Sequence, residues 1–573
     1  MAETLQGRLR ARLDEAPAAR ALACIDARGA AIWWTRAELH AEAARCAARM
    51  GELGLRAGDV VVLVCVDPRE AALGALGAWR AGAIPLLVAP PTIQGLNSSL
   101  ATILRHALAR TEARLLVLTR AAAPRADELA AALPGLRIER GFETLLAPAQ
   151  PAISVEPGLI EPRDAGTAAA LQLSSGTTRL PRIARWSHAR LLCALDGMAQ
   201  GMNLASDDVY ANWTPLYHDM GLVNNLLTCL VRGIPLALLS PLDVVRSPSL
   251  WLRALESTGA TQTWSPNFGY ALAAERCRDE ELAGLDLSRV RGFWNAAERV
   301  HVSTFERFLA RFARHGVRRD ACRTNFGCVE TIGGATFSAR SAALATERLD
   351  LDVLREQRVA RAADPTTRRA QTYVGCGRVH PLLELAVFDP AGRALPDGHV
   401  GTLGFRGRAR FDGYLGDEEA AHNVLRDEWV LPGDEGYLRD GELYWTGRRD
   451  ERINLQGKKL DPSELEPVLL AVEGLRKGCF CAFGAEDETR GTQVLVVASE
   501  VEPEAEADLA GLAARARAAL SRELGLAVEE LLLVRKGTLA KTSSGKRRHL
   551  HFRDLFARGE LEALHVSRAG SLG

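Results

Sequence analysis

Residues 171–181 read Leu-Gln-Leu-Ser-Ser-Gly-Thr-Thr-Arg-Leu-Pro, an apolar strand pattern that leads into hydroxyl side chains around a single glycine. Consecutive backbone N–H groups in such a turn, together with Ser and Thr hydroxyls, are able to enclose phosphate oxygens. The turn is not of the Walker A type, because the second glycine and the Gly-Lys-Ser/Thr ending are missing. Taken alone, the segment is nearly as compatible with an ordinary polar turn as with a phosphate-binding loop.

The sequence before this turn alternates between helical and strand patterns. The strand patterns are uninterrupted apolar runs, as in strands that are buried on both faces of a parallel sheet. Alternation of this kind is typical of an α/β fold. Helix patterns cover residues 38–55 and 70–81, and strand patterns cover residues 60–66, 82–88 and 114–118.

The second half of the chain has a different character. Residues 338–370 are polar and rich in Arg and Ala, which predicts an inserted helical or loop segment without strands. Residues 373–415 contain short strand patterns between Gly and Pro turns, which predicts a small β-rich unit. A boundary is predicted near residues 447–450, followed by a small α+β domain. Its expected strands cover residues 453–456, 478–483, 493–497 and 531–534, and its helices begin at Pro462 and cover residues 509–524.

Composition excludes several classes of protein. With 573 residues the chain is too long for one ordinary domain. Lys and Arg together number 71, as do Asp and Glu, and this balance argues against a nucleic-acid partner or an anionic membrane surface. No apolar run approaches the roughly 20 residues of a membrane span, and the charged first 20 residues do not resemble a signal peptide. The 11 scattered cysteines indicate reduced core residues, so we expect a cytoplasmic protein.

Seven further motifs change the interpretation of the hydroxyl-rich turn. In chain order they are Asn-Trp-Thr-Pro-Leu-Tyr-His-Asp-Met-Gly-Leu (212–222), Trp-Ser-Pro-Asn-Phe (264–268), Asn-Ala-Ala-Glu (295–298), Asn-Phe-Gly-Cys-Val-Glu (325–330), Leu-Pro-Gly-Asp-Glu-Gly (431–436), Tyr-Trp-Thr-Gly-Arg (444–448) and Lys-Thr-Ser-Ser-Gly-Lys (541–546). This ordered set resembles the acyl-adenylate-forming superfamily of acyl-CoA ligases, luciferases and peptide-synthetase adenylation domains. The resemblance covers nearly the whole chain.

Within that superfamily the chain is most similar to the fatty acyl-AMP ligases. Arg179 stands where most other members have Gly, and residues 217–222 and 266–268 are also characteristic of this branch. The segment 338–370 falls where these ligases carry an insertion that is thought to hinder the rearrangement needed for coenzyme A. The resemblance therefore implies activation of a carboxylic acid with ATP, followed by transfer to the phosphopantetheine thiol of an acyl carrier protein. It also implies an N-terminal domain (1–447) of two α/β subdomains plus a small β-rich subdomain, and a mobile α+β C-terminal domain (448–573).

The same resemblance assigns roles to individual residues. Glu330 would ligate Mg²⁺, Lys546 would reach the substrate carboxylate and the α-phosphate, and Asp450 would be the hinge of the C-terminal domain. Asp434 would accept hydrogen bonds from the ribose hydroxyls, and Arg448 would contact ribose or phosphate. The remaining ATP-binding residues would be Ser174, Ser175, Gly176, Thr177 and Thr178 at the phosphates, and Asn295, Ala296, Ala297, Glu298, Phe326 and Gly327 around the adenine.

The acid would bind beyond His218, which resembles the residue that guards the acyl entrance and orients the carboxylate. Asn224 and Asn225 stand where this branch has small glycines. Together with two tryptophans they predict a pocket that is shorter, or more polar, than one for a plain long-chain fatty acid. The predicted pocket residues are Tyr217, Asp219, Asn224, Asn225, Trp264 and Trp294.

Three functions remain open at this point: an acyl-AMP ligase, an acyl- or aryl-CoA ligase, and a non-catalytic acyl-nucleotide-binding protein. Arg179 and the insertion favour the first over the second. Departures from the family pattern occur at Ile183, Ala296, Val329 and Ala540. The altered glycine positions among them, Ile183 and Ala296, are the argument for the third function, whereas retention of Glu330, Asp434, Arg448 and Lys546 opposes it. For the first, the basic residues Arg449, Arg452, Lys458 and Lys459 are expected to steer an acidic carrier protein.

Overall fold

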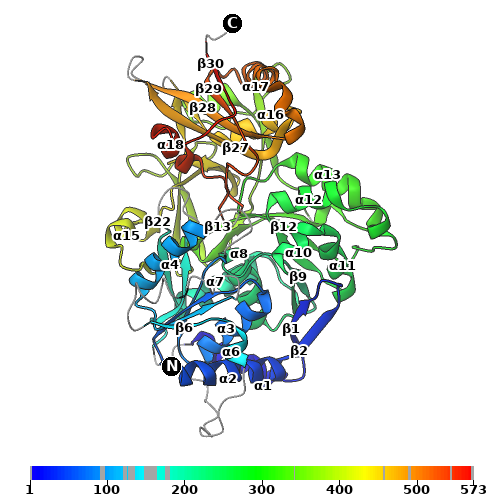
Figure 1. Ribbon diagram of the computed structural model, residues 1–573, viewed down its shortest axis with the longest axis vertical. Helices are drawn as coiled ribbons and strands as arrows, with labels where there is room; N and C mark the ends of the chain where they lie inside the picture. Colours follow the sequence, from blue (N-terminus) through cyan, green and yellow to red (C-terminus); the bar gives the residue numbers. More distant parts are fainter. Residues whose placement is uncertain are drawn as a thin grey trace.

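The computed structural model describes residues 3–90, 97–119, 126, 136–146, 164–174, 181–340, 342–455, 458–487, 492–542 and 545–569. The chain forms a large N-terminal α/β part with two large sheets and a β-rich unit, and a small C-terminal domain. Figure 1 shows the C-terminal strands and helices, in orange and red, as a separate body above the N-terminal part. This arrangement confirms the predicted fold class. None of the helices described is both long and apolar enough to cross a membrane.

The first large sheet has seven strands. At its centre, β3 (Val60–Val64) pairs in parallel with β4 (Ile84–Leu87) and β5 (Leu115–Leu118). All five side chains of β3 are buried, as expected for a strand covered on both faces. The apolar runs in the sequence therefore predicted these strands correctly. The other strands are β6 (Arg137–Glu139), β7 (Ala168–Leu173), β8 (Ile183–Ser187) and β20 (Gly413–Tyr414), and nearby helices are α2 (Arg36–Glu52), α3 (Pro68–Arg80), α4 (Asn97–Thr111) and α6 (Glu143–Leu146).

The second large sheet has nine strands and carries two of the sequence motifs at one edge. Its strand β12 (Gly292–Asn295) ends at the 295–298 motif, and it pairs in parallel with β13 (Cys322–Cys328). Because parallel strands end on the same side, the two motifs emerge next to one another. The other strands are β1 (Arg20–Ile25), β2 (Ala31–Thr35), β9 (Tyr210–Asn212), β10 (Leu236–Leu238), β11 (Gln262–Ser265), β14 (Gly333–Phe337) and β17 (Arg378–Val379). The helices of this part include α1 (Leu5–Glu15), α7 (His188–Gly201), α9 (Thr228–Arg232), α10 (Pro241–Arg246), α11 (Pro248–Thr258), α12 (Asn267–Arg276) and α13 (Val302–Phe312).

The β-rich unit contains six antiparallel strands, of which β18 and β19 fall within the predicted range 373–415, whereas the other four lie beyond it. Its strand β23 (Asp434–Arg439) pairs with β24 (Glu442–Arg448), which is the last strand before the predicted boundary. The other strands are β18 (Leu383–Phe388), β19 (Gly401–Gly407), β21 (Leu425–Arg426) and β22 (Trp429–Val430), and one helix, α15 (Glu418–Val424), accompanies them.

The insertion contains a strand, so the prediction of a purely helical or loop segment was wrong. Strand β15 (Thr346–Asp350) pairs in antiparallel fashion with β16 (Ala370–Val374), and α14 (Leu351–Gln357) follows it. Strand β15 is mostly polar and partly exposed, and only Leu349 is buried. A strand with one buried side chain lacks the apolar alternation that reveals strands in a sequence.

The C-terminal domain is built on a four-stranded sheet. The expected strands and the helix over 509–524 are all present, although β27, β28 and β29 are longer than predicted. The expected helix from Pro462 begins as the short turn η7 (Pro462–Leu465) and continues as α16 (Glu466–Leu470). The sheet strands are β27 (Leu475–Asp487), β28 (Thr492–Val501), β29 (Val528–Val534) and β30 (His565–Arg568), a separate pair is β25 (Ile453–Leu455) with β26 (Lys458–Leu460), and the helices are α17 (Leu509–Leu524) and α18 (His549–Ala557).

The insertion and the C-terminal domain share one hydrophobic core. Leu349, Leu351 and Leu354 of the insertion belong to the same buried cluster as the apolar side chains of β27, β28 and α17. An ion pair lies within this contact: Arg355 donates through Nε and Nη2 to Glu464 Oε2, at 3.0 and 2.9 Å. Its Nη1 also donates to the Leu524 carbonyl oxygen at 3.1 Å. The C-terminal domain is therefore held through the insertion by both apolar and charged groups.

We expect Arg355→Ala to destabilise this contact strongly. The side chains of Arg355 and Glu464 are only 5% and 3% exposed, and loss of one partner leaves a buried charge that costs about 3–5 kcal/mol. Urea denaturation followed by far-ultraviolet circular dichroism measures the change. The matched control is Lys458→Ala, which removes the exposed pair with Glu356 and should change stability by about 0.5 kcal/mol or less. Equal effects of the two substitutions would contradict this account.

Candidate functional site

A cavity of about 230 Å³ opens where the C-terminal domain meets the large domain. It is lined from both sides, so it exists only while the two domains are in contact. Large-domain residues on its wall are Trp213, Thr214, Pro215, Tyr217, His218, Met220, Pro241, Leu242, Val245, Pro266, Phe268 and Ala297, and C-terminal residues are Ala540, Lys541, Thr542 and Gly545. Ligands commonly bind in clefts of this kind between domains.

His218 reaches this cavity from a tight turn after β9. The residue caps the short helix α8 (Asp219–Gly221), and the chain then continues as the π-helical segment η2 (Leu222–Leu227). A Cβ atom on Gly221 would lie 2.1 Å from the Pro215 carbonyl oxygen, so only glycine fits at this position. Short π-helical segments are often found at functional sites.

The His218 ring is oriented by the carboxylate next to it in the chain. His218 Nδ1 lies 2.7 Å from Asp219 Oδ1, and the Met220 N–H donates to the same oxygen at 2.8 Å. Burial raises the pKa of Asp219, but the charge and hydrogen bond of His218, the charge of Lys546 and the Met220 amide outweigh burial and lower it. Asp219 therefore stays ionised, and Lys546 is close enough to act on it.

Lys546 belongs to a tight turn in which Thr542 and Gly545 line the cavity. The Thr542 N–H donates to the Lys546 carbonyl oxygen at 2.8 Å, and the Lys546 N–H donates to Thr542 Oγ1 at 2.9 Å. Gly545 has a φ of +86°, a conformation that favours glycine, and its position for a Cβ lies 3.2 Å from the ring of Phe268. The turn thus packs directly on the large domain.

Glu330 lies close to the start of β8, the strand that follows the hydroxyl-rich turn. The Tyr414 hydroxyl donates to Glu330 Oε1, and Tyr414 belongs to β20, which pairs with β8. Burial and the Glu330 carboxylate raise the pKa of Tyr414, so its hydroxyl remains protonated. Within the described residues no three His, Cys, Asp or Glu side chains could hold a metal ion together. A single carboxylate fits Mg²⁺, which often takes one or two carboxylates and completes its shell with water and substrate phosphates.

Ser174 is the only predicted residue of the hydroxyl-rich turn that the structure describes; Ser175, Gly176, Thr177 and Thr178 lie outside the described residues. Its Oγ accepts from the Arg182 N–H at 2.9 Å, and its own N–H donates to the Arg182 carbonyl oxygen at 2.8 Å. These two hydrogen bonds close the base of the turn.

The residues predicted around the adenine come from β12 and β13. The Phe326 ring packs parallel to Phe405, with 5.7 Å between ring centroids and 8° between planes. Asn295 Nδ2 donates to Asn267 Oδ1 at 3.1 Å, whereas its buried Oδ1 meets no donor in the part of the chain that the structure describes. Gly327 is tightly packed, because a Cβ there would lie 2.2 Å from the Gly333 carbonyl oxygen. Asn295 therefore offers one buried acceptor to a ligand.

Glu298 lies on the domain contact. Its Oε1 accepts from the Phe268 N–H at 2.9 Å. Burial and the neighbouring Glu466 raise the pKa of Glu298, although Arg547 and Lys541 act in the opposite direction. Glu466, Arg547 and Lys541 belong to the C-terminal domain, so Glu298 faces that domain although it is part of the 295–298 motif.

Asp434, Arg448 and Asp450 are brought together at the end of β24. Trp445 Nε1 donates to Asp434 Oδ1 at 2.8 Å, and Arg448 Nη1 lies 3.5 Å from Asp434 Oδ2. Arg448 Nε also donates to Asp450 Oδ1 at 3.0 Å. Burial, together with the nearby carboxylates, raises the pKa of the adjacent Glu451 to about 8. The sequence did not identify Glu451, because its raised pKa depends on burial and on Asp434 and Asp461, which only the folded chain brings close to it.

Four residues predicted for the acyl pocket lie in the packed interior rather than on the cavity wall. Trp264 and Trp294 stack with centroids 5.1 Å apart and an angle of 14°. Asn224 Oδ1 accepts from the Gly334 N–H at 3.1 Å, and Asn225 Nδ2 donates to the Met220 carbonyl oxygen at 2.7 Å. All four side chains are buried. The apolar wall is supplied instead by Trp213, Met220 and Phe268, which belong to the motifs but were not assigned to the pocket, and by Leu242 and Val245, which no motif contains.

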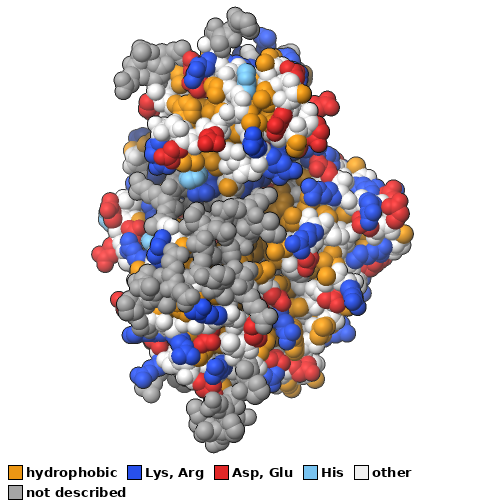
Figure 2. Space-filling model, viewed as in Figure 1, with side chains coloured by type: hydrophobic (Ala, Val, Ile, Leu, Met, Phe, Trp, Pro, Cys, Tyr) orange, Lys and Arg blue, Asp and Glu red, His pale blue; other side chains and the backbone are white. Residues whose placement is uncertain are grey.

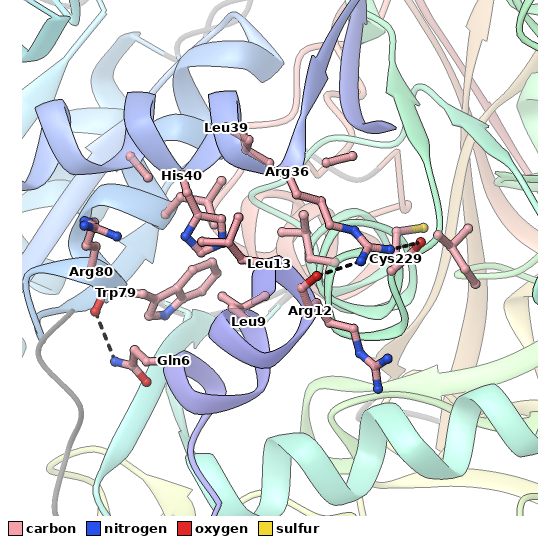
Figure 3. Close-up of a pocket in the computed structure, with 16 residues that line it drawn as sticks. Gln6, Leu9, Arg12, Leu13, Arg36, Leu39, His40, Trp79, Arg80 and Cys229 are labelled. Carbon is pink, nitrogen blue, oxygen red and sulfur yellow. Dashed lines mark hydrogen bonds between the residues drawn. The ribbon is translucent and has the colours of Figure 1, made fainter. Parts of the chain in front are cut away.

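A second cavity, of about 40 Å³, lies far from these motifs among α1, α2, α3 and α9. Figure 3 shows Leu9, Leu13 and Trp79 around it, with Gln6 Nε2 donating to the Trp79 carbonyl oxygen at 3.1 Å. Its size suits one or two water molecules at most. Because no motif residue reaches it, we do not assign the candidate site there.

Comparisons with known proteins identify the family and the fold of the chain. The sequence profile described as "AMP-binding enzyme" matches residues 9–415. The long-chain-fatty-acid–AMP ligase FadD26 of Mycobacterium marinum is 27% identical over 558 residues, which cover 91% of each chain. The medium-chain-fatty-acid–[acyl-carrier-protein] ligase JamA of Moorena producens is 29% identical over 411 residues, 69% of each chain. A structure from a study of fatty acyl-adenylate ligases of E. coli and L. pneumophila superposes with a TM-score of 0.89 at 25% identity, and covers 97% of this chain and 98% of that one.

The 295–298 motif makes a prediction about stability. Ala297 has a φ of +73°, a backbone conformation that costs an L-residue roughly 1–2 kcal/mol. Ala296 has an ordinary negative φ, and its side chain is only 3% exposed. Ala296→Gly should lower the free energy of unfolding by about 1.5 kcal/mol, through loss of a buried methyl group and a gain in unfolded-chain entropy. Ala297→Gly should change it by about 0.5 kcal/mol or less, because relief of strain offsets the same entropy. Urea denaturation of the two variants measures both changes, and an equal loss of unfolding free energy in both would contradict backbone strain at Ala297.

Proposed function

The chain belongs to the AMP-binding enzyme family and is an adenylate-forming ligase, and from this premise we propose that it converts a medium-chain or shorter carboxylic acid to acyl-AMP and transfers the acyl group to an acyl carrier protein. One observation carries the proposal. The turn that bears Lys546 is docked on the large domain, at the cavity that His218 lines. Lys546 is close enough to Asp219, the partner of His218, for its charge to lower the pKa of Asp219. The cation proposed for adenylation is thus next to the proposed acid site.

The reaction joins two anions, so its main demand is positive charge at the reacting atoms. The carboxylate oxygen attacks the α-phosphorus of ATP, and the bond to the pyrophosphate oxygen breaks. The Lys546 ammonium would balance the charge of the carboxylate and the α-phosphate as they approach. Mg²⁺ bound at Glu330 would supply further positive charge shared by the phosphates. The His218 ring, held by Asp219, would orient the attacking carboxylate.

The remaining motif residues would hold the nucleotide. Asp434 has a carboxylate at the domain junction that would accept hydrogen bonds from the ribose hydroxyls, and Arg448 lies beside it. The unpartnered Asn295 Oδ1 would accept a hydrogen bond from the adenine, and the half-buried Phe326 ring would stack on it. Ser174 begins the turn that would hold the pyrophosphate oxygens, and Asp450 would act as the hinge between residues 1–447 and 448–573.

The size of the cavity supports a short or medium-length acid. An apolar cavity of about 150 Å³ accommodates benzene. The present cavity of about 230 Å³ is apolar in most of its lining, and Trp264 and Trp294 stack on one another in the packed interior rather than on its wall. The relative JamA is named for a medium-chain acid, whereas FadD26 is named for a long-chain acid. The size and the apolar lining of the cavity favour a medium-chain acid.

The insertion supports a carrier protein rather than coenzyme A as the acceptor. A large rotation of the C-terminal domain would have to break the buried Arg355–Glu464 pair and expose the core that surrounds it. This resistance fits a ligase whose insertion hinders the rearrangement needed for coenzyme A. JamA, which is named as an acyl-carrier-protein ligase, is one of the relatives that match this interpretation.

A carrier protein would approach the junction of the two domains, where Figure 2 shows Lys and Arg side chains gathered. Of the four basic residues expected to steer it, Arg452 is already bound to Glu435 and Lys458 to Glu356. Arg449 is exposed and is the better candidate for an acidic partner.

The function is tested with ATP, Mg²⁺ and a panel of acetate, hexanoate, octanoate, dodecanoate, palmitate and benzoate, with acyl-AMP detected by mass spectrometry. We expect hexanoate or octanoate to be the best substrate and palmitate to react at least about tenfold more slowly, because one CH₂ group is worth about 0.8 kcal/mol only where it finds space. Each reaction is repeated with coenzyme A and with a holo acyl carrier protein, and only the carrier should consume the acyl-AMP. Formation of acyl-CoA would make the protein a CoA ligase, and failure of every acid would favour a non-catalytic nucleotide-binding protein.

Lys546→Ala tests the proposed catalytic cation. Removal of one group that stabilises transition-state charge costs about 10²–10³-fold in rate, so adenylation should fall by about that factor. Lys536→Ala is the matched control, because Lys536 is exposed outside the cavity. Calorimetric titration with ATP shows whether the nucleotide still binds. Adenylation at the unsubstituted rate in the Lys546 variant would remove this residue from the mechanism.

A further inference from the structure

We propose that His301 is a positioning residue for adenylation: through Glu466 and Arg547 it latches the C-terminal domain in the orientation that presents Lys546 to the acid site. The inference rests on the proposed role of Lys546. His301 precedes α13 of the large domain, whereas Glu466 begins α16 and Arg547 directly follows Lys546 in the C-terminal domain. None of the three belongs to the motifs that identified the nucleotide site.

A single carboxylate joins the three residues. His301 Nε2 lies 2.8 Å from Glu466 Oε2, and Arg547 Nη1 donates to the same oxygen at 3.0 Å. Arg547 Nη2 donates to Glu466 Oε1, which makes the arginine contact bidentate. The side chains are 11%, 10% and 15% exposed for His301, Glu466 and Arg547, so these hydrogen bonds are shielded from water.

Arg547 is fixed within its own domain by two additional contacts. Its Nε donates to the Gly478 carbonyl oxygen at 3.3 Å, and its guanidinium lies 4.5 Å from the centroid of the Phe480 ring. Arg547 and Glu466 therefore move together when the C-terminal domain moves. The contact between His301 and Glu466 is the part of the latch that crosses between domains, and it breaks when Lys546 leaves the site.

The large-domain end of the latch is connected to the nucleotide motif. The His301 N–H donates to Asn267 Oδ1 at 3.3 Å, and Asn295 Nδ2 donates to the same oxygen at 3.1 Å. The side chain of the next residue, Phe268, packs on Gly545, which is one position before Lys546. The position of the His301 ring is thus tied to the motif proposed to bind adenine, and the position of Lys546 is tied to the same helix.

The charges around the latch favour the docked state. Burial acts to raise the pKa of Glu466, but Arg547 and His301 outweigh it and hold that pKa far below its ordinary value. Glu298 and Lys541 are the other charged groups near the cluster. Loss of the His301 contact would leave Arg547 as the partner of Glu466. The Oε2 atom of Glu466 would then become exposed to water where the two domains separate.

The two half-reactions separate this role from general stability. We expect His301→Ala to lower kcat for adenylation of octanoate by about tenfold while KM for ATP changes less than about twofold, since a hydrogen bond to a charged group is lost only in the docked state. Acyl transfer from added octanoyl-AMP to the holo carrier protein should be unchanged or faster. His301→Gln, whose amide is able to donate to Glu466, should recover most of the adenylation rate.

The matched control is Lys477→Ala, which removes an exposed contact of 3.4 Å between Lys477 and Glu275 across the same domain junction. It should leave both half-reactions unchanged. Equal loss of both half-reactions in His301→Ala, no loss in either, or a glutamine variant as slow as the alanine variant would overturn the latch.

A measurement that needs no acid separates failure of the latch from failure of the proposed function. Hydrogen exchange of the full-length protein with Mg²⁺ and ATP should show faster exchange in residues 466–470 and 541–548 for His301→Ala than for Lys477→Ala. Unchanged exchange in both segments would overturn the latch even if octanoate proved not to be a substrate. If exchange rises as expected but Lys546→Ala keeps its adenylation rate, the latch stands and the role of Lys546 fails.

Discussion

The ion pair between Arg355 and Glu464 is the contact on which the arrangement of the two domains depends. Both side chains are almost fully buried, and three hydrogen bonds from the guanidinium satisfy the groups on either side. Buried pairs of this kind contribute little net stability over an apolar packing, but a misplaced partner is costly, so they favour one geometry over its neighbours. With the C-terminal domain fixed in this way, the turn at Thr542–Lys546 meets Phe268 and the cavity acquires its second wall. The site is thus a product of domain placement as much as of any motif.

Two kinds of contact hold the junction, and they differ in what they oppose. The insertion adds apolar surface and the Arg355–Glu464 pair, which resist separation of the domains regardless of what is bound. The cluster of His301, Glu466 and Arg547 starts two residues further along the same C-terminal segment, and its His301 end lies beside the residues proposed to bind the nucleotide. A domain held by the first contact alone could still tilt. The second contact would select the tilt that brings Lys546 towards Asp219.

Much of the fold could be predicted because buried parallel strands leave an unmistakable pattern. The runs that became β3, β4 and β5 are apolar at every position, and helix α17 was predicted with its correct bounds. Strand β15 was missed because one buried leucine does not make a pattern. The motifs identified His218 and Ala297 as site residues, and both line the cavity. Sequence could not show that Leu242 and Val245 share that wall, or that Glu466 meets His301, because these pairs are brought together only by packing of distant segments.

Glu451 gives the junction a chemical property beyond its shape. Burial and the neighbouring carboxylates raise its pKa to about 8, whereas a glutamate in water has a pKa of about 4.3. At pH 7 this side chain therefore carries a proton while the domains are docked, and it would lose that proton on exposure to water. A rearrangement that opens the junction around Glu451 would then release a hydrogen ion to the solvent, and reclosure would take one up. Motion of the C-terminal domain is in this sense an acid–base reaction, whose equilibrium shifts towards the open form as the medium becomes more alkaline.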